Sequence, residues 1–311
     1  FIRYATATYD PTSKSWGSFA VSKVTRAGDS IRAMNPSFTV DANGSTWVAY
    51  VEENTANSTA GIVVYRRLAG KSNWESVGYG QPFSGTSNYR DPQYAKRSAR
   101  LVNIPSGIGM VYTAGPDIFW AQRKLKGGAD LAWNSEGLFL SGTQDKDPMS
   151  SHFSAATDDA GNVLVTFTDN GSLYYNRREA ANSQWLTDPL ILVSADNPKS
   201  GQPTYAQVSL LGNGQMLIAH NAGMSMRVLK APTTAVLKTD FKCQLLAYHN
   251  NLDPAAYYKD ARLEMPAFLG SATLVPLLQQ YQGYQPVDGG PTPPQYAGGV
   301  TFSPTAAPSC Q

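Results

Sequence analysis

A repeat of strand–turn–strand segments constrains the fold of this chain more than any other feature. Each segment reads as an apolar strand, a turn that contains glycine, and a second apolar strand. The five segments are Pro36–Val51, Arg100–Thr113, His152–Thr168, Tyr205–His220 and Glu264–Gln279. Their turn glycines are separated by 63, 54, 53 and 56 residues: Gly44, Gly107, Gly161, Gly214 and Gly270. Glycine supplies the positive φ that a tight hairpin needs, so the pattern predicts five antiparallel hairpins.

Each of the first four hairpins is followed by a third apolar strand, a large aromatic residue and a fourth strand. The third strands lie around Tyr65, Trp120, Tyr175 and Arg227. The aromatic residues are Trp74, Trp133, Trp185 and Phe241. Four strands in each repeat of this length are typical of a β-propeller, in which each repeat is one blade. A large β-sandwich is the alternative, but it does not require such regular spacing.

The predicted number of blades depends on which blade the N-terminal strands join. Residues 1–24 repeat only the second half of a unit. We therefore expect the N-terminal strands to complete the last blade, because that closure covers an exposed sheet edge. This predicts a single all-β domain over residues 1–311 with five four-stranded blades. Tyr296–Phe302 also reads as a third strand, which leaves one strand too many and keeps six blades open.

Composition and charge exclude several classes of protein. Charged residues make up 15% of the chain and aromatic residues 11%. A chain of this kind can bury enough apolar surface to fold, which excludes intrinsic disorder. The net charge of +2 and the scattered basic residues argue against nucleic acid. No apolar run approaches the ~20 residues that span a bilayer. We expect a monomer that binds neither nucleic acid nor membrane.

Three features favour secretion. The chain begins with Phe1 rather than Met, as a processed protein would. Cys243 and Cys310 fall in blades that would be neighbours, so a disulfide between them is geometrically reasonable. The sequons that a secretory pathway could glycosylate begin at Asn43, Asn57 and Asn170.

The third-strand units carry a family resemblance. The segments IVVYRRLAGKSNW (62–74) and IRYATATYDPTSKSW (2–16) resemble the repeat units of sialidase-like, BNR-type β-propellers. Residues 32–36 are a loose counterpart of the family's N-terminal Arg-Ile-Pro element, whereas no unit has the full Asp-box pattern S-x-D-x-G-x-x-W. The superfamily includes sialidases, other glycosidases, uronic-acid polysaccharide lyases and lectins. The resemblance therefore implies a glycan ligand but does not select a reaction.

Propeller geometry sorts the loops into two faces. The fourth-to-first and second-to-third connections share one face, and the tight glycine turns occupy the other, where we expect little chemistry. All three histidines of the chain, His152, His220 and His249, map to the first face. A neutral histidine can act as a general base near pH 7. His220 and His152 come from the ends of strands in adjacent blades, so they are the preferred catalytic pair.

A short helix is predicted over residues 253–262, with Asp253 as its N-cap and Pro254 in its first turn. Tyr258 and Arg262 are four residues apart and would share one face of it. Tyr258 could donate a proton, and Arg262 could hold a carboxylate. The other predicted substrate-binding residues on the same face are Arg32, Arg97, Tyr205, His249 and Asp169.

Two kinds of carbohydrate-active enzyme fit these residues. In a lyase, an arginine neutralises a uronate carboxylate, His220 or His152 removes the C5 proton, and Tyr258 protonates the leaving oxygen. In a glycoside hydrolase, two carboxylates do the acid–base or nucleophilic work. The candidate carboxylates are Asp91, Asp145, Asp147, Asp169, Glu52 and Glu264.

A lectin without catalysis is the alternative function, and a protein-interaction propeller is a third. Lectins of this shape repeat their pocket residues in every blade. Here the distance from the turn glycine to the third-strand centre is 21 residues in the first unit but 13, 14 and 13 in the next three. This asymmetry favours one central site. The signature motifs of zinc, nucleotide and flavin sites are absent, so we expect no cofactor and no metal.

Overall fold

The computed structural model describes most of the strands that the repeat predicts. The described residues are 2–24, 30–54, 56, 59–79, 99–114, 117–126, 129–140, 153–169, 171–194, 203–222, 225–248, 262–270, 275–281 and 296–304. The chain divides into two units, Phe1–Leu140 and Ser141–Gln311, and each has its own sheets and apolar clusters. No helix in the described ranges is long and apolar enough to cross a membrane.

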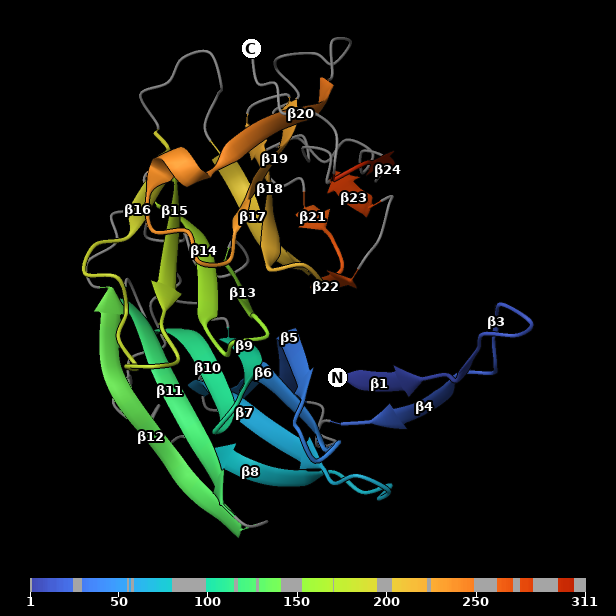
Figure 1. Ribbon diagram of the computed structural model, residues 1–311. Helices are drawn as coiled ribbons and strands as arrows, with labels where there is room; N and C mark the ends of the chain where they lie inside the picture. The colour runs from blue at the N-terminus through green and yellow to red at the C-terminus, as the bar shows by residue number, and fades with distance from the viewer. Residues whose placement is uncertain are drawn as a thin grey trace. The chain divides into compact units, whose positions relative to one another are not determined.

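Unit 1 contains two four-stranded antiparallel sheets in which the strands follow one another in chain order (Figure 1). The first sheet consists of β5 (Ile31–Val40), β6 (Thr46–Asn54), β7 (Thr59–Arg67) and β8 (Glu75–Tyr79). The second consists of β9 (Ala99–Ile104), β10 (Gly107–Ala114), β11 (Asp117–Lys126) and β12 (Ala129–Leu140). Both confirm the predicted plan of four strands per repeat.

Alternate side chains of β6 pack in two different buried clusters of unit 1. Trp47, Ala49 and Val51 belong to a buried cluster that also contains Leu101 and Met110 of the second sheet. The intervening residues of β6 belong to a separate cluster on the opposite face of the first sheet. Successive side chains of a strand point to opposite faces, so β6 is buried from both sides.

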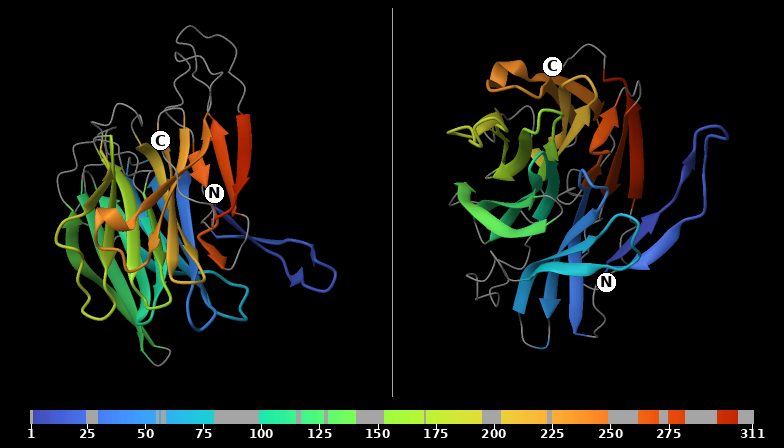
Figure 2. Two further views of the ribbon diagram at one scale, coloured as in Figure 1. Left: turned by 45° about the horizontal axis from the view of Figure 1, so that its top comes forward. Right: turned by 60° about the horizontal axis from the view of Figure 1, so that its bottom comes forward.

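The N-terminal hairpin belongs to unit 1 and projects from the first sheet (Figures 1 and 2). In it β1 (Arg3–Thr6) pairs with β4 (Ala20–Lys23), and β2 (Tyr9–Asp10) pairs with β3 (Ser15–Trp16). The ring of Tyr4 meets that of Trp74 edge-on at 5.4 Å between centroids. The Arg67 guanidinium lies 4.8 Å from the centre of the Tyr4 ring, so a cation–π contact fixes the hairpin on β7.

Unit 2 contains two further sheets of the same plan. The first consists of β13 (Ser154–Thr157), β14 (Val163–Asp169), β15 (Ser172–Arg178) and β16 (Leu190–Val193). The second consists of β17 (Pro203–Leu211), β18 (Gln215–Ala222), β19 (Ser225–Pro232) and β20 (Lys242–Tyr248). A short 3₁₀ helix, η2 (Lys238–Asp240), leads into β20. Cys243 lies on β20 and is disulfide-bonded, and its predicted partner Cys310 lies outside the described residues.

The predicted last blade differs from the observed strands in three ways. Its sheet consists of β21 (Arg262–Glu264), β23 (Val275–Tyr281) and β24 (Tyr296–Phe302), in the order β21–β23–β24. Gly270 does not turn this hairpin, because it ends β22 (Phe268–Gly270), which adds to β17 as a parallel strand. Arg262 begins β21 opposite Gln280 rather than ending a helix, because its backbone pairs with β23.

In the described residues the N-terminal strands do not pair with β23. β23 is flanked by β21 on one side and by β24 on the other, so β24 occupies the place assigned to the N-terminal strand. In the described chain, β1 and β4 pair with each other instead. Both β24 and the N-terminal strands have a suitable apolar pattern, but the pattern does not specify the partner.

The same turn chemistry recurs in both units and explains two of the predicted hairpins. Asp41 Oδ1 accepts hydrogen bonds from the backbone N–H groups of Asn43 and Ser45, both at 2.9 Å. Asp158 Oδ1 accepts from Ala160 N at 3.1 Å and Asn162 N at 2.8 Å. Gly44 and Gly161 follow with φ of +78° and +85°, which a residue with a side chain rarely adopts.

Candidate functional site

The strand ends of unit 2 hold the best-defined candidate, His220. It lies near the end of β18, opposite Arg227 of β19, and its side chain is 0% exposed. On the other side, the register of β17 shifts between Thr204 and Gln207, so Tyr205 and Ala206 form a bulge beside His220. Bulges redirect side chains and interrupt the ladder of hydrogen bonds, and they are common next to functional sites.

The hydrogen bonding of His220 assigns its protons. Nδ1 lies 3.0 Å from the carbonyl oxygen of Asn221. A carbonyl oxygen only accepts, so Nδ1 carries the hydrogen and donates it. Nε2 therefore holds the lone pair, and it is buried without a hydrogen-bond partner in the described part of the chain. This is the tautomer that can accept a proton at Nε2.

The surroundings of His220 keep it neutral. The pKa of His220 is lowered to about 4, chiefly by burial; the hydrogen bond to Asn221 opposes this shift, and the positive charge of Arg227 adds to it. Directly opposite residues of an antiparallel pair project to the same face, so His220 and Arg227 share one face of the sheet. At pH 7 this face presents an uncharged base beside a cation.

That face is otherwise apolar. Ile218 and Leu229 belong to the cluster that packs against Leu164 and Tyr175 of the sheet β13–β16. Thr166 follows Leu164 on the same face of β14, and its buried Oγ1 also has no partner among the described residues. His220 is thus a polar group at the margin of an apolar interface between two sheets of unit 2.

Unit 1 contains a second buried ionisable group at the corresponding strand, β6. Glu52 is 3% exposed, and its Oε2 accepts a hydrogen bond from Tyr50 Oη at 3.2 Å. The ring of Tyr65 stacks on that of Tyr50 at 5.9 Å. Burial raises the pKa of Tyr50 strongly, and the charges of Tyr65 and Glu52 act in the same direction. The phenol therefore stays protonated and donates to the carboxylate.

Four of the predicted site residues lie outside the described residues: His152, Tyr258, Arg97 and His249. Three of the candidate carboxylates, Asp91, Asp145 and Asp147, also lie outside them. Their predicted roles stay predictions.

The other predicted residues occupy described strands. Tyr205 is brought beside His220 by the bulge in β17. Asp169 ends β14 opposite Ser172, and its charge adds to burial in raising the pKa of Tyr174. Arg32 is exposed on β5, opposite Glu53 of β6. Arg262 lies on β21 and Glu264 ends that strand.

Sequence reasoning missed two partners that the structure supplies. In the sequence, Arg227 served only to mark a third strand. In the structure, Ala222 pairs with Ser225, and this register places Arg227 opposite His220. Tyr50 was not considered, although residues two apart on a strand share a face, which brings it to Glu52. Among the described residues, no three metal-ligating side chains form a group.

Comparison with known proteins gives the fold but no family. No family model matches the chain, and no curated protein matches it. Among solved structures, the α-L-arabinanase of Penicillium chrysogenum complexed with arabinobiose is 11% identical and covers 80% of this chain and 77% of its own, with a TM-score of 0.51. The likeness shows a shared fold.

Two other solved structures are less similar. A GH43 endo-arabinanase from Bacillus licheniformis is 11% identical, covers 88% of this chain and 95% of its own, and has a TM-score of 0.42. A polysaccharide lyase described as a PL25 ulvan lyase is 13% identical, covers 79% and 63%, and has a TM-score of 0.46.

These neighbours are β-propeller glycoside hydrolases and polysaccharide lyases. The fold shared with the Penicillium chrysogenum arabinanase makes the repeated four-stranded sheets propeller blades, and the described residues contain four of them complete. The neighbours do not single out the sialidase-like superfamily, and the predicted count of five blades is not confirmed.

Proposed function

We propose that this chain is a carbohydrate-active β-propeller that cleaves an anionic polysaccharide by β-elimination, with His220 as the general base. The observation that carries the proposal is the tautomer of His220: Nδ1 is committed to Asn221, and Nε2 keeps a free lone pair. The arabinanase whose structure holds arabinobiose supports a glycan as the ligand of this fold.

The reaction needs no group beyond an acid, a base and a cation. Nε2 of His220 removes the C5 proton, which is acidified by the neighbouring uronate carboxylate. The electron pair of that C–H bond forms the C4=C5 double bond, and the C4–O bond breaks. The leaving oxygen takes a proton from an acid, for which Tyr258 is proposed. Arg227, opposite His220, offers positive charge for the carboxylate.

Burial of His220 sets a condition on this mechanism. A fully covered base reaches a sugar only if the residues beside it move when the substrate binds. The bulge at Tyr205 is the place where the ladder between β17 and β18 is already interrupted, so we propose that it moves. Arg262, Arg97, Arg32, His249 and Asp169 are proposed to bind further sugar units, with His152 as the alternative base.

The test is product formation from uronate-containing polysaccharides. β-Elimination produces an unsaturated uronate, which we expect to absorb at about 235 nm. His220→Asn keeps a donor for the Asn221 carbonyl but removes the basic nitrogen. We expect it to lower kcat by about 10²–10⁴-fold. Thr166→Val is the matched control, because it changes the same interface without touching the base. Equal turnover by wild type and His220→Asn overturns the assignment.

A glycoside hydrolase is the second candidate, because Glu52 is a buried carboxylate with a phenol donor. It predicts reducing sugar without the absorbance of an unsaturated product, and loss of that activity in Glu52→Gln. Binding of a glycan without either product supports the lectin alternative.

The proposal extends to the whole molecule. We propose five blades in one domain of the sialidase-like superfamily, acting as a secreted monomer. Analytical ultracentrifugation tests the monomer, since a dimer would have twice the mass of 33.5 kDa.

A further inference from the structure

A pocket lies at the tight-turn end of the sheets of unit 2. Its volume is about 170 Å³. The lining includes Asp159 from the β13–β14 turn, Leu210 from β17, Gly214 from the β17–β18 turn, Thr234 and Phe268 of β22. A single water needs on the order of 10–15 Å³ of such space, so the pocket accommodates a ligand of monosaccharide size.

Main-chain hydrogen bonds hold the walls of this pocket. Gly212 N donates to Gly270 O at 2.8 Å, and Leu210 N donates to Ala267 O at 2.9 Å, which fixes the segment that bears Phe268. Thr233 N donates to Gly214 O at 2.9 Å. The pocket is therefore formed before any ligand binds, which reduces the entropic cost of binding.

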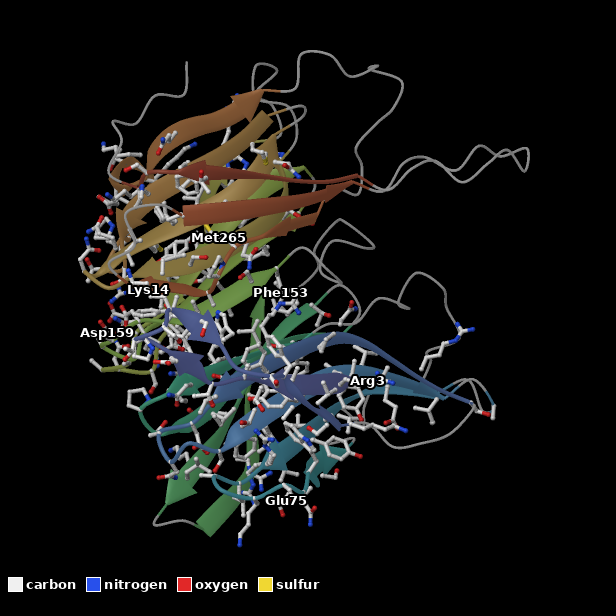
Figure 3. All side chains as sticks on the ribbon, turned by 90° about the vertical axis from the view of Figure 1, so that its right-hand side faces the viewer. Arg3, Lys14, Glu75, Phe153, Asp159 and Met265 are labelled. Carbon is white, nitrogen blue, oxygen red and sulfur yellow. The ribbon has the colours of Figure 1, made fainter. Side chains whose placement is uncertain are left out.

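The β13–β14 turn is fixed in the same way. Asp158 uses both carboxylate oxygens within the turn: Oδ1 accepts from two backbone N–H groups, and Oδ2 accepts from Asn162 Nδ2 at 2.9 Å. Asp159, labelled in Figure 3, is exposed and lines the pocket. Its carboxylate has no hydrogen bond or ion pair among the described residues. Asp158 therefore stabilises the turn, whereas the Asp159 carboxylate can accept a hydrogen bond from a ligand.

The free surface combines an aromatic ring with this carboxylate. Phe268 is 61% exposed although it lies in a strand, and its cross-strand neighbour Leu210, which is buried, lines the same pocket. Sugars have apolar C–H faces and hydroxyl groups that donate hydrogen bonds. A sugar ring placed against Phe268 can therefore pack on the phenyl ring while a hydroxyl donates to Asp159.

Charge selects among sugars. The ionisable side chains of the lining are both aspartates, Asp158 and Asp159. A uronate would be repelled here, in contrast to the cation beside His220. We propose that this pocket binds an uncharged sugar residue as an accessory glycan site.

The pocket is separate from the candidate reaction site. Gly214 directly precedes β18 and His220 lies near its other end, and six residues of extended strand span roughly 20 Å. The tight-turn face, where little chemistry was expected, carries this site because Phe268 enters as an additional strand on β17. The pocket does not depend on the reaction proposed at His220.

Saturation-transfer NMR with three uncharged disaccharides, cellobiose, galactobiose and mannobiose, tests the proposal on the full chain. We expect at least one to bind, and Phe268→Ala to weaken binding by about tenfold. Asp159→Asn should weaken it in the same direction. Phe19→Ala is the matched control, because Phe19 is an equally exposed phenylalanine of the N-terminal hairpin at 65% exposure.

Three results overturn the proposal: no disaccharide binds, Phe268→Ala binds as wild type does, or a uronate disaccharide competes equally at this pocket. The outcome is distinguishable from a failure at His220. His220→Asn should retain disaccharide binding, and Phe268→Ala should retain turnover of a short uronate substrate.

Discussion

The two units place different ionisable groups on the corresponding strand, the second of a blade. In unit 1, Glu52 of β6 is a carboxylate that receives a hydrogen bond from Tyr50. In unit 2, His220 of β18 has a cation opposite, and its Nε2 has no hydrogen-bond partner in the part of the chain that the structure describes. The carboxylate is offered a donor, whereas the imidazole is offered a positive charge that opposes its protonation.

This difference shows that the repeat conserves geometry and not chemistry. Tyr50 donates a hydrogen bond to the buried Glu52 side chain. Burial and Arg227 favour the neutral form of His220. The hydrogen bond of Tyr50 satisfies the buried Glu52 side chain. The neutral base His220, whose Nε2 has no partner among the described residues, can accept a proton. The two groups can be separated by experiment.

The largest expected effect is the pH dependence that His220 gives to stability. Its pKa is about 4 in the folded chain and about 6.5 in an unfolded one, so the unfolded chain binds more protons between these values. Stability should therefore fall as the pH is lowered from about 6.5 towards 4, by on the order of 3 kcal/mol, and change little above 6.5.

Thermal unfolding of wild type and His220→Asn between these pH values measures this effect. The variant lacks the titrating imidazole, so the difference between the two proteins should shrink at the acid end. Parallel curves for the two proteins over the whole range would show that His220 titrates normally and is not the poised base that the comparison requires.

The contrast between the units also shows what the sequence can predict. Gly44 and Gly161 predicted hairpins correctly, because a tight turn is determined by local sequence. The partner of β23 could not be read, since β24 and the N-terminal strands both present apolar residues and only tertiary packing chooses. Arg262 was assigned to a helix on a four-residue spacing, and pairing with Gln280 overrides it.

In the candidate site too, local features could be predicted from the sequence, and features that depend on strand pairing could not. His220 was identified because a histidine at a strand end is visible in the sequence. Arg227 was not recognised as its neighbour, because that requires the register of β18 and β19. The pocket near Phe268 could not be predicted at all, since it depends on the parallel pairing of β22 with β17.

The second effect concerns Glu52. Tyr50→Phe removes a donor from a buried carboxylate and should destabilise the chain by about 1–3 kcal/mol at neutral pH. Glu52→Gln should cost less, because the amide oxygen still accepts from Tyr50. Urea unfolding of both single variants and the double variant gives the coupling energy. A coupling near zero would mean that Tyr50 packs beside Glu52 without stabilising its charge.

The smallest effect separates the two causes that lower the pKa of His220. Burial is the larger and Arg227 the smaller, so Arg227→Met should raise the His220 pKa only part of the way to about 6.5. Methionine keeps much of the side-chain length and removes the charge. NMR titration of the imidazole measures the shift directly, and the acid limb of any turnover should move to higher pH with it. An unchanged pKa would leave burial as the whole cause. The cation of unit 2 would then act on a bound ligand and not on the histidine, and the contrast with Glu52 would rest on the hydrogen bond of Tyr50 alone.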